Sequence, residues 1–164
     1  MAVRPSIQHA EPFSVVGVPA TIDELLSIAT AHAAAEALDD PAPVLATLED
    51  DCAYELQPLG VVLEGMDLAR RYYDHFFSTF RPLVAGYTMR GEWHDERGLG
   101  QEYTIWTRTG PNGGLERHEV IGILTFGRDK LSGERVYGSD RLLRLMFGPV
   151  LDEGRPIEVG APAS

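Results

Sequence analysis

The apolar pattern between Met66 and Phe80 predicts the helix around which the rest of the chain is organised. Apolar side chains recur there at spacings of three and four, which is the repeat of one helix face. The face consists of Leu68, Ala69, Tyr72, Tyr73, Phe76, Phe77 and Phe80. So apolar a face has to be covered, and the alternating segments after residue 84 are expected to cover it.

A strand is predicted just ahead of this helix, over Cys52–Gln57, where side chains alternate between two faces. One face holds Cys52, Tyr54 and Leu56, and the other holds Ala53, Glu55 and Gln57. Pro58 and Gly60 then mark a turn.

Two further helices are predicted nearer the N-terminus. Thr21 and Glu24 have the spacing of a capping box, so a helix is expected over Ile22–Leu38. Asp39–Pro41 is expected to end it. A shorter helix is expected over Val44–Glu49.

After Arg81 and Pro82 interrupt the helical pattern, period-two alternation predicts a sheet. The expected strands are Val84–His94, Leu99–Thr109, Leu115–Phe126 and Gly133–Ser139. Within the third strand one face holds His118, Val120, Gly122, Leu124 and Phe126. Gly110–Gly114 gives the strongest turn signal between strands. Asp140 is expected to cap a last helical turn.

Helices followed by a run of strands indicate an α+β domain, with helices on one face of a curved antiparallel sheet. A chain of 164 residues is long enough for one domain with a substantial core. We expect this domain to span residues 21–148, with an extended arm at 1–20 and a polar tail at 149–164. Leu99–Thr109 is apolar on both faces, which indicates that a second layer, such as another subunit, covers the outer face.

Charge and cysteine content narrow the classes of partner. The formal net charge of −11 disfavours binding to nucleic acids and to anionic membranes. No apolar run approaches the roughly 20 residues of a transmembrane helix, and no signal peptide is evident, so a cytoplasmic location is expected. Cys52 is the only cysteine, and we expect a buried, unreactive thiol.

Six short motifs and their order resemble one family. The motifs are Glu55–Gly60, Glu64–Gly65, Ala69–Tyr73, Gly110–Gly114, Leu124–Phe126 and Gly133–Tyr137. Over about residues 21–148 the chain resembles the SnoaL-like polyketide cyclase family of the nuclear transport factor 2-like superfamily. The resemblance implies a cone-shaped α/β roll, a mostly apolar pocket and a homodimer formed through the sheet. Relatives such as ketosteroid isomerase and limonene-epoxide hydrolase use no cofactor, so none is expected, and other members only bind ligands.

Compared with ketosteroid isomerase, the chain lacks two functional carboxyl groups. In that enzyme a carboxylate is the base, and a tyrosine and a protonated aspartate hold the oxyanion. The resemblance places Leu56 or Gln57 at the base, Gly122 at the aspartate and His32 at the tyrosine. Steroid isomerisation by that mechanism is therefore disfavoured. Tyr73 matches the tyrosine that supports the donor, so the resemblance implies a His32–Tyr73 pair.

The predicted catalytic residues are His32, Tyr73 and His118. Imidazole, with an unperturbed pKa of about 6.5, suits proton transfer at neutral pH. The alternative for His32 is a hydrogen-bonded histidine inside the core, and for His118 a structural role near the strand end. The predicted substrate-binding residues are Tyr54, Gln57, Tyr72, Trp106 and Phe126.

These residues lead to two hypotheses. The first is a cofactor-independent acid–base enzyme of cyclase, isomerase or hydrolase type, acting on a small apolar ring-containing molecule. The second is a non-catalytic ligand-binding or dimerisation module of the same fold. The missing carboxylates favour the second hypothesis, and the polar groups of His32 and His118 support the first. No metal site is expected, because the neighbouring side chains of His94–Glu96 point apart in a turn.

Overall fold

The computed structural model describes residues 20–38, 40–110 and 113–158. The main helices are α1 (Ile22–Ala35), α2 (Pro41–Leu45), α3 (Met66–His75) and α4 (Asp140–Phe147). Shorter helical turns are η1 (Phe76–Phe80), η2 (Arg81–Leu83) and η3 (Gly148–Glu153). The strands are β1 (Leu48–Gln57), β2 (Val61–Glu64), β3 (Val84–Asp95), β4 (Gly98–Arg108), β5 (Leu115–Phe126), β6 (Leu131–Tyr137) and β7 (Arg155–Pro156). Within these ranges no helix is long and apolar enough to cross a membrane.

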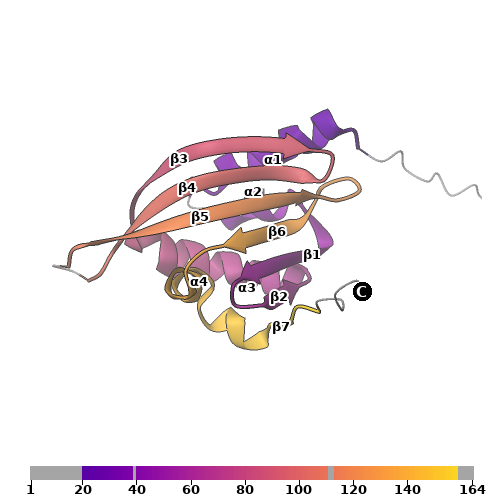
Figure 1. The fold of residues 1–164 in the computed structure, drawn as a ribbon. Coiled ribbons are helices and arrows are strands. Elements are labelled where there is room, and N and C mark those ends of the chain that lie inside the picture. Colours follow the sequence, from indigo (N-terminus) through magenta and orange to yellow (C-terminus); the bar gives the residue numbers. More distant parts are fainter. Residues whose placement is uncertain (1–19, 39, 111–112, 159–164) are drawn as a thin grey trace, which may run out of the picture.

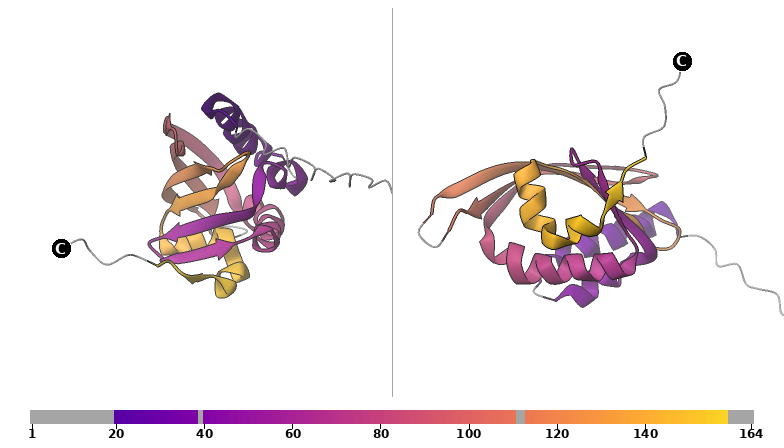
Figure 2. Two further views of the ribbon diagram at one scale, coloured as in Figure 1. Left: turned by 90° about the vertical axis from the view of Figure 1, so that its right-hand side faces the viewer. Right: turned by 90° about the horizontal axis from the view of Figure 1, so that it is seen from below.

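The strands form one curved sheet with the order β3-β4-β5-β6-β1-β2-β7 (Figure 1). Neighbouring strands are antiparallel except β1 and β6, which run parallel, so the sheet is mixed rather than purely antiparallel. The sheet curves around the helices, which lie on its concave side (Figure 2). The predicted α+β class, with helices on one face of a curved sheet, is confirmed.

The predicted aromatic face of the long helix lies at the centre of the core. It extends from α3 into η1, a single π-helical turn. Tyr72 stacks on Phe147 of α4, with ring centres 4.2 Å apart. The largest fully buried aromatic side chains are Tyr54, Tyr72, Tyr73, Phe80 and Phe147.

The inward face of β1 is also as predicted. Cys52, Tyr54 and Leu56 are buried, and they alternate with more exposed neighbours. Burial raises the pKa of the Cys52 thiol to about 11. The thiol is therefore unreactive at neutral pH, as expected.

The first helix starts as predicted and ends earlier. The Glu24 carboxylate accepts a hydrogen bond from the Thr21 N–H at 2.7 Å, and the Thr21 hydroxyl accepts one from the Glu24 N–H at 3.3 Å. This capping box fixes the start of α1. The helix ends at Ala35 rather than Leu38, so Glu36 lies at its C-terminal cap.

The second helix begins earlier than predicted. Pro41, expected to end α1, instead lies in the first turn of α2, where its fixed φ is favoured and its missing N–H is not needed. Asp40 caps this helix by accepting a hydrogen bond from the Ala42 N–H at 2.9 Å. Because α2 already ends at Leu45, β1 can start at Leu48, earlier than the expected Cys52.

The C-terminal region is more ordered than predicted. Ser139, rather than Asp140, caps α4, since its hydroxyl accepts a hydrogen bond from the Leu142 N–H at 3.2 Å. Beyond residue 148, where a tail was expected, the chain forms η3 and then β7, which pairs with β2. Val150 of η3 is buried in the core. Residues 1–19 of the expected N-terminal arm lie outside the described residues.

Candidate functional site

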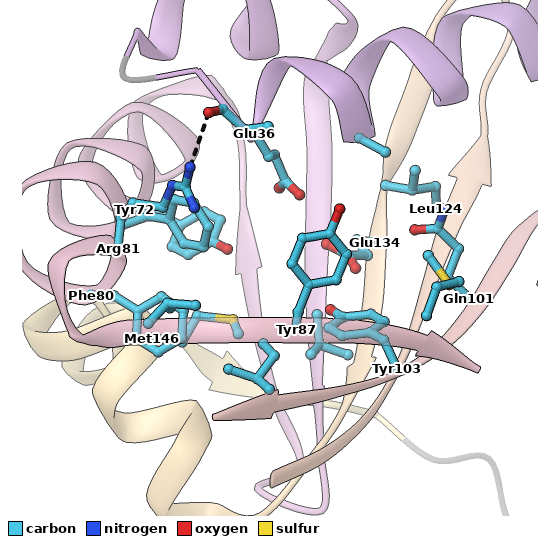
Figure 3. Close-up of a pocket in the computed structure, with 17 residues that line it drawn as sticks. Glu36, Tyr72, Phe80, Arg81, Tyr87, Gln101, Tyr103, Leu124, Glu134 and Met146 are labelled. Carbon is cyan, nitrogen blue, oxygen red and sulfur yellow. Dashed lines mark hydrogen bonds between the residues drawn. The ribbon is translucent and has the colours of Figure 1, made fainter. Parts of the chain in front are cut away.

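A cavity of about 200 Å³ lies between the helices and the concave face of the sheet (Figure 3). Its apolar wall consists of Ala33, Ala37, Phe76, Phe80, Val84, Met89, Ile105, Leu124, Val136 and Met146. Its polar wall consists of Glu36, Tyr72, Arg81, Tyr87, Gln101, Tyr103 and Glu134. A mostly apolar pocket with a few convergent polar groups is the usual form of a small-molecule site.

Glu134 of β6 fills space that Gly122 of β5 leaves open. A Cβ atom at position 122 would lie 2.5 Å from Oε1 of Glu134 and 3.5 Å from the hydroxyl oxygen of Tyr103. A carboxyl group and a phenol therefore share the space above this glycine. At the position where the resemblance calls for an aspartate, a glutamate from the adjacent strand supplies the carboxyl.

The surroundings of Glu134 favour its neutral form. Burial raises the pKa of the Glu134 carboxyl well above its usual value, and the negative charge of Glu36 adds to the effect. In the part of the chain that the structure describes, this carboxyl has no hydrogen-bond or ion-pair partner. Its remaining accessible surface faces the cavity. A neutral carboxylic acid in this place can donate a hydrogen bond to a ligand.

Glu36 reaches the cavity from the end of α1 and is part of a buried network. Its Oε1 accepts a hydrogen bond from the Tyr73 hydroxyl at 3.1 Å and lies 3.6 Å from Nε2 of His32. The Tyr73 hydroxyl is also 3.0 Å from Nε2 of His32 and 3.0 Å from the Tyr54 hydroxyl. The expected His32–Tyr73 pair is confirmed, and it connects to a carboxyl group in the cavity wall.

Both ring nitrogens of His32 have hydrogen-bond partners, and the partner of Nδ1 defines the direction of that bond. The Thr47 hydroxyl donates to the Val44 carbonyl at 2.5 Å, so it accepts from Nδ1–H of His32 at 2.6 Å. The Tyr73 hydroxyl, which donates to Glu36, lies against the other ring nitrogen, Nε2. This hydroxyl therefore connects the imidazole of His32 to the carboxyl group of Glu36.

Four buried or half-buried tyrosines in and behind the cavity wall remain neutral hydroxyl groups. Burial raises the pKa of Tyr54, Tyr72, Tyr73 and Tyr103 well above the usual value. Each can therefore donate a hydrogen bond but does not act as a phenolate near neutral pH. Among the described residues, no group of three or more His, Cys, Asp or Glu side chains could hold a metal ion.

Solved structures with similar backbones identify the fold. An NTF2-like protein of unknown function from Cytophaga hutchinsonii is 13% identical, with a TM-score of 0.58 over 70% of this chain and 99% of its own. A candidate SnoaL-like polyketide cyclase from Mesorhizobium loti is 18% identical, with a TM-score of 0.53 over 68% and 97%. This chain has the NTF2-like fold.

A third neighbour, from Catenulispora acidiphila, has a ketosteroid isomerase-like fold and was solved with trimethylamine. It is 14% identical, with a TM-score of 0.55 over 75% of this chain and 94% of its own. No protein-family model and no curated protein matches the sequence. The similarity therefore shows the NTF2-like fold, and the activity has to be argued from the side chains of the site.

Within this NTF2-like fold, four predicted site residues lie together. Tyr72 lines the cavity. His32, Tyr73 and Tyr54 lie directly behind the wall, joined to it through Glu36. His32 is fully buried, so its connection to the cavity runs through hydrogen bonds rather than direct contact.

His118 lies apart from this network. Its Nε2 is 3.0 Å from the Thr107 hydroxyl and its Nδ1 is 3.4 Å from the Ser139 hydroxyl. It points inward from β5 as predicted, yet it is not part of the cavity wall. Burial lowers the pKa of its imidazole below the usual value. His118 joins the sheet to the start of α4 as a neutral side chain.

Three predicted substrate-binding residues also lie away from the cavity wall. Gln57 lies on the face of β1 opposite Tyr54, and the turn at Pro58 does not bring it to the wall. Trp106 lies on the outer face of β4, because strand alternation separates it from the inward-facing residues on either side. Phe126, at the end of β5, lines a separate groove.

Sequence reasoning missed six polar residues of the wall: Glu36, Arg81, Tyr87, Gln101, Tyr103 and Glu134. Glu36 had a usable signal, since it follows His32 by four residues and so lies on the same helix face. Tyr103 shares the inward face of its strand with Ile105. Glu134 is harder to find, because its role depends on how β6 pairs with the glycine-containing part of β5.

Proposed function

We propose that this protein is a cofactor-independent acid–base enzyme of cyclase, isomerase or hydrolase type that acts on a small ring-containing carbonyl compound. The observation that carries the proposal is the presence of Glu36 and Glu134 in one cavity wall with different surroundings. Glu36 is hydrogen-bonded to Tyr73, whereas the half-buried Glu134 has a pKa that desolvation raises. Two carboxyl groups in different surroundings can serve as base and acid at the same pH.

Each polar group has a place in the proposed reaction. Glu36 removes a proton from the carbon next to the carbonyl group of the substrate. Glu134 and Tyr103 donate hydrogen bonds to the oxygen on which negative charge develops. Glu36 keeps the abstracted proton until it returns it to the substrate, and the hydrogen bond from the Tyr73 hydroxyl, which His32 also contacts, holds the Glu36 carboxyl in place. Two of the structural neighbours bear names from this reaction class, which supports the proposal without identifying a substrate.

The proposal is tested by hydrogen–deuterium exchange at the carbon next to a ketone. The protein is incubated in D₂O with 2-tetralone and with smaller cyclic ketones, and exchange is followed by NMR. Glu36→Gln should slow the catalysed exchange by at least about 100-fold, because it removes the base. Glu134→Ala should slow it by about 100-fold, whereas Glu134→Gln retains a donor and should lose less.

A matched control is Glu102→Gln, which changes a carboxylate outside the cavity wall and should leave exchange unchanged. Ketones that bind in the cavity without exchange above the buffer rate would contradict the enzyme proposal. That result would favour the alternative, a ligand-binding module of the same fold.

We also propose that the protein acts as a homodimer in the cytoplasm. In support, Ile121 of β5 and Tyr137 of β6 are paired across the strands and both are exposed on the outer face of the sheet. Light scattering after gel filtration should give twice the mass of the chain. Ile121→Asp should give the monomer mass, and an unchanged mass would contradict an interface at this face.

A further inference from the structure

Arg81 carries an unused hydrogen-bond donor in the cavity wall. Its Nη2 donates to the Ala37 carbonyl at 2.9 Å (Figure 3). Its Nε–H is buried and has no acceptor among the described residues. A buried, unpaired donor on a charged group is costly, and native proteins rarely keep one without a reason. In a cavity wall, the simplest reason is an acceptor that arrives with a bound molecule.

Arg81 also lacks an acidic partner. Across the described ranges, every arginine except Arg81 and Arg108 forms an ion pair with Asp or Glu. Arg108 is exposed, and water can solvate its charge. The chain has a formal net charge of −11, so acidic partners are abundant. An unpaired guanidinium in the wall of a cavity is therefore available to an anionic ligand.

The polar groups of the cavity are separated along its length. Arg81 lies at one end of the group of side chains in Figure 3, whereas Glu134 and Tyr103 lie toward the other end. Phe76, Phe80, Ile105 and Met146 contribute apolar wall. A ligand that satisfies both ends has an anionic oxygen at one end, an apolar ring, and a carbonyl oxygen at the other end.

We infer that the cavity binds a small ring-containing carboxylate, whose carboxylate accepts hydrogen bonds from Arg81. Planar guanidinium and carboxylate groups match in shape and charge, which favours this anion. The inference rests on the proposed function, because it takes the end with Glu134 and Tyr103 as the reacting end. It adds the substrate class: a cyclic oxo acid rather than a purely apolar ketone.

The test is isothermal titration calorimetry with three probes that share one ring: benzoate, benzamide and benzylamine. The wild-type protein should bind benzoate at least about tenfold more tightly than benzamide. Arg81→Gln should weaken benzoate binding by about tenfold or more and leave benzamide binding unchanged. Arg108→Gln, at the other described arginine that forms no ion pair, is the matched control and should change neither affinity.

Thermal unfolding of each variant shows whether it is folded. If Arg81→Gln does not fold, Arg81→Lys replaces it; this variant keeps the charge but loses Nε–H, and its benzoate affinity should still fall. Equal affinity for benzoate and benzamide, preference for benzylamine, or no benzoate binding at about 10 mM would each overturn the inference. These titrations need no turnover. If the protein does not prefer benzoate over benzamide, the inference about the carboxylate is wrong but the proposed enzymatic function is unaffected. If benzoate binds as expected but no ketone exchange is catalysed, only the proposed enzymatic function is refuted.

Discussion

His32 and His118, the two buried histidines among the described residues, differ in what lies beyond their hydrogen-bond partners. Nε2 of His32 contacts the Tyr73 hydroxyl, which in turn contacts Glu36 in the cavity wall. The partners of His118 are two hydroxyl groups that lead to the start of α4 and not to the cavity. Hydrogen bonds thus connect His32 to a carboxyl group of the cavity wall, whereas His118 has no such connection within the described residues.

Burial and inward orientation therefore do not distinguish the two histidines. Both side chains are buried and both have partners at each ring nitrogen. A continuous chain of hydrogen bonds to a titratable group in a cavity distinguishes them. Mutations that interrupt the chain on one side, with matched changes on the other, test this comparison.

The largest effect is expected for His32→Ala. The substitution leaves a void and removes the partners of Thr47 and Tyr73, so we expect unfolding to require about 3 kcal/mol less free energy. His118→Ala should cost less, about 1–2 kcal/mol, because its contact with Ser139 is long at 3.4 Å. Urea unfolding measures both. Equal losses would show that the network around His32 adds nothing to stability.

The second effect concerns Glu134 and its pH dependence. The folded protein holds the Glu134 proton more tightly than the unfolded chain, because the folded pKa is raised above 4.5. Stability from this group is therefore complete below pH 4.5 and is lost as the pH rises through the raised pKa. Glutamine cannot ionise, so Glu134→Gln does not lose stability in this way. At alkaline pH its free energy of unfolding should exceed that of the wild type by about 1–3 kcal/mol.

Chemical unfolding over a pH series measures this gain. Glu102→Gln is the control, since Glu102 pairs with Arg90 outside the cavity wall. Its difference from wild type should not grow with pH. Parallel curves for wild type and Glu134→Gln would show that the Glu134 carboxyl is already ionised in the folded protein.

The sequence predicted the helical and strand periodicities well because each element has a strong apolar face. The aromatic face of α3 and η1 and the inward face of β1 follow from spacing alone. Short elements were harder to predict. The first turn of α2 starts with a proline, which in a sequence also indicates the end of a helix. The short strand β2 pairs with β1 and β7, and the two-residue β7 pairs with β2.

The candidate site was only partly predictable for a related reason. The His32–Tyr73 pair was predicted because these two positions match two neighbouring tyrosine positions in ketosteroid isomerase. Glu134 reaches the cavity only because Gly122 of the adjacent strand has no side chain. That relation needs the register of two strands that are separated by a turn, and the sequence pattern of either strand alone does not contain it.

A smaller effect is expected for Tyr73→Phe, which removes the hydroxyl that joins His32 to Glu36. The single substitution should cost about 1 kcal/mol, because one shared hydroxyl is lost from a buried network. Combined with His32→Ala, the two losses should fall short of their sum by about 1 kcal/mol. Combined with His118→Ala, they should add, since these residues share no partner. Additivity in both pairs would show that the hydrogen-bonded chain is not coupled.

The smallest effect is expected for the protonation of His118. Burial lowers the pKa of this imidazole below its usual 6.5, so the unfolded chain takes up a proton before the folded protein does. Stability from the neutral histidine is present above pH 6.5 and is lost as the pH falls below it. Between about pH 7.5 and 5.5, wild type should lose up to about 1 kcal/mol relative to His118→Gln, which cannot take up the proton. Urea unfolding at both pH values measures the difference. If both proteins lose the same free energy, the hydroxyl groups of Thr107 and Ser139 accommodate a charged imidazole. The two histidines would then differ only in their connection to the cavity.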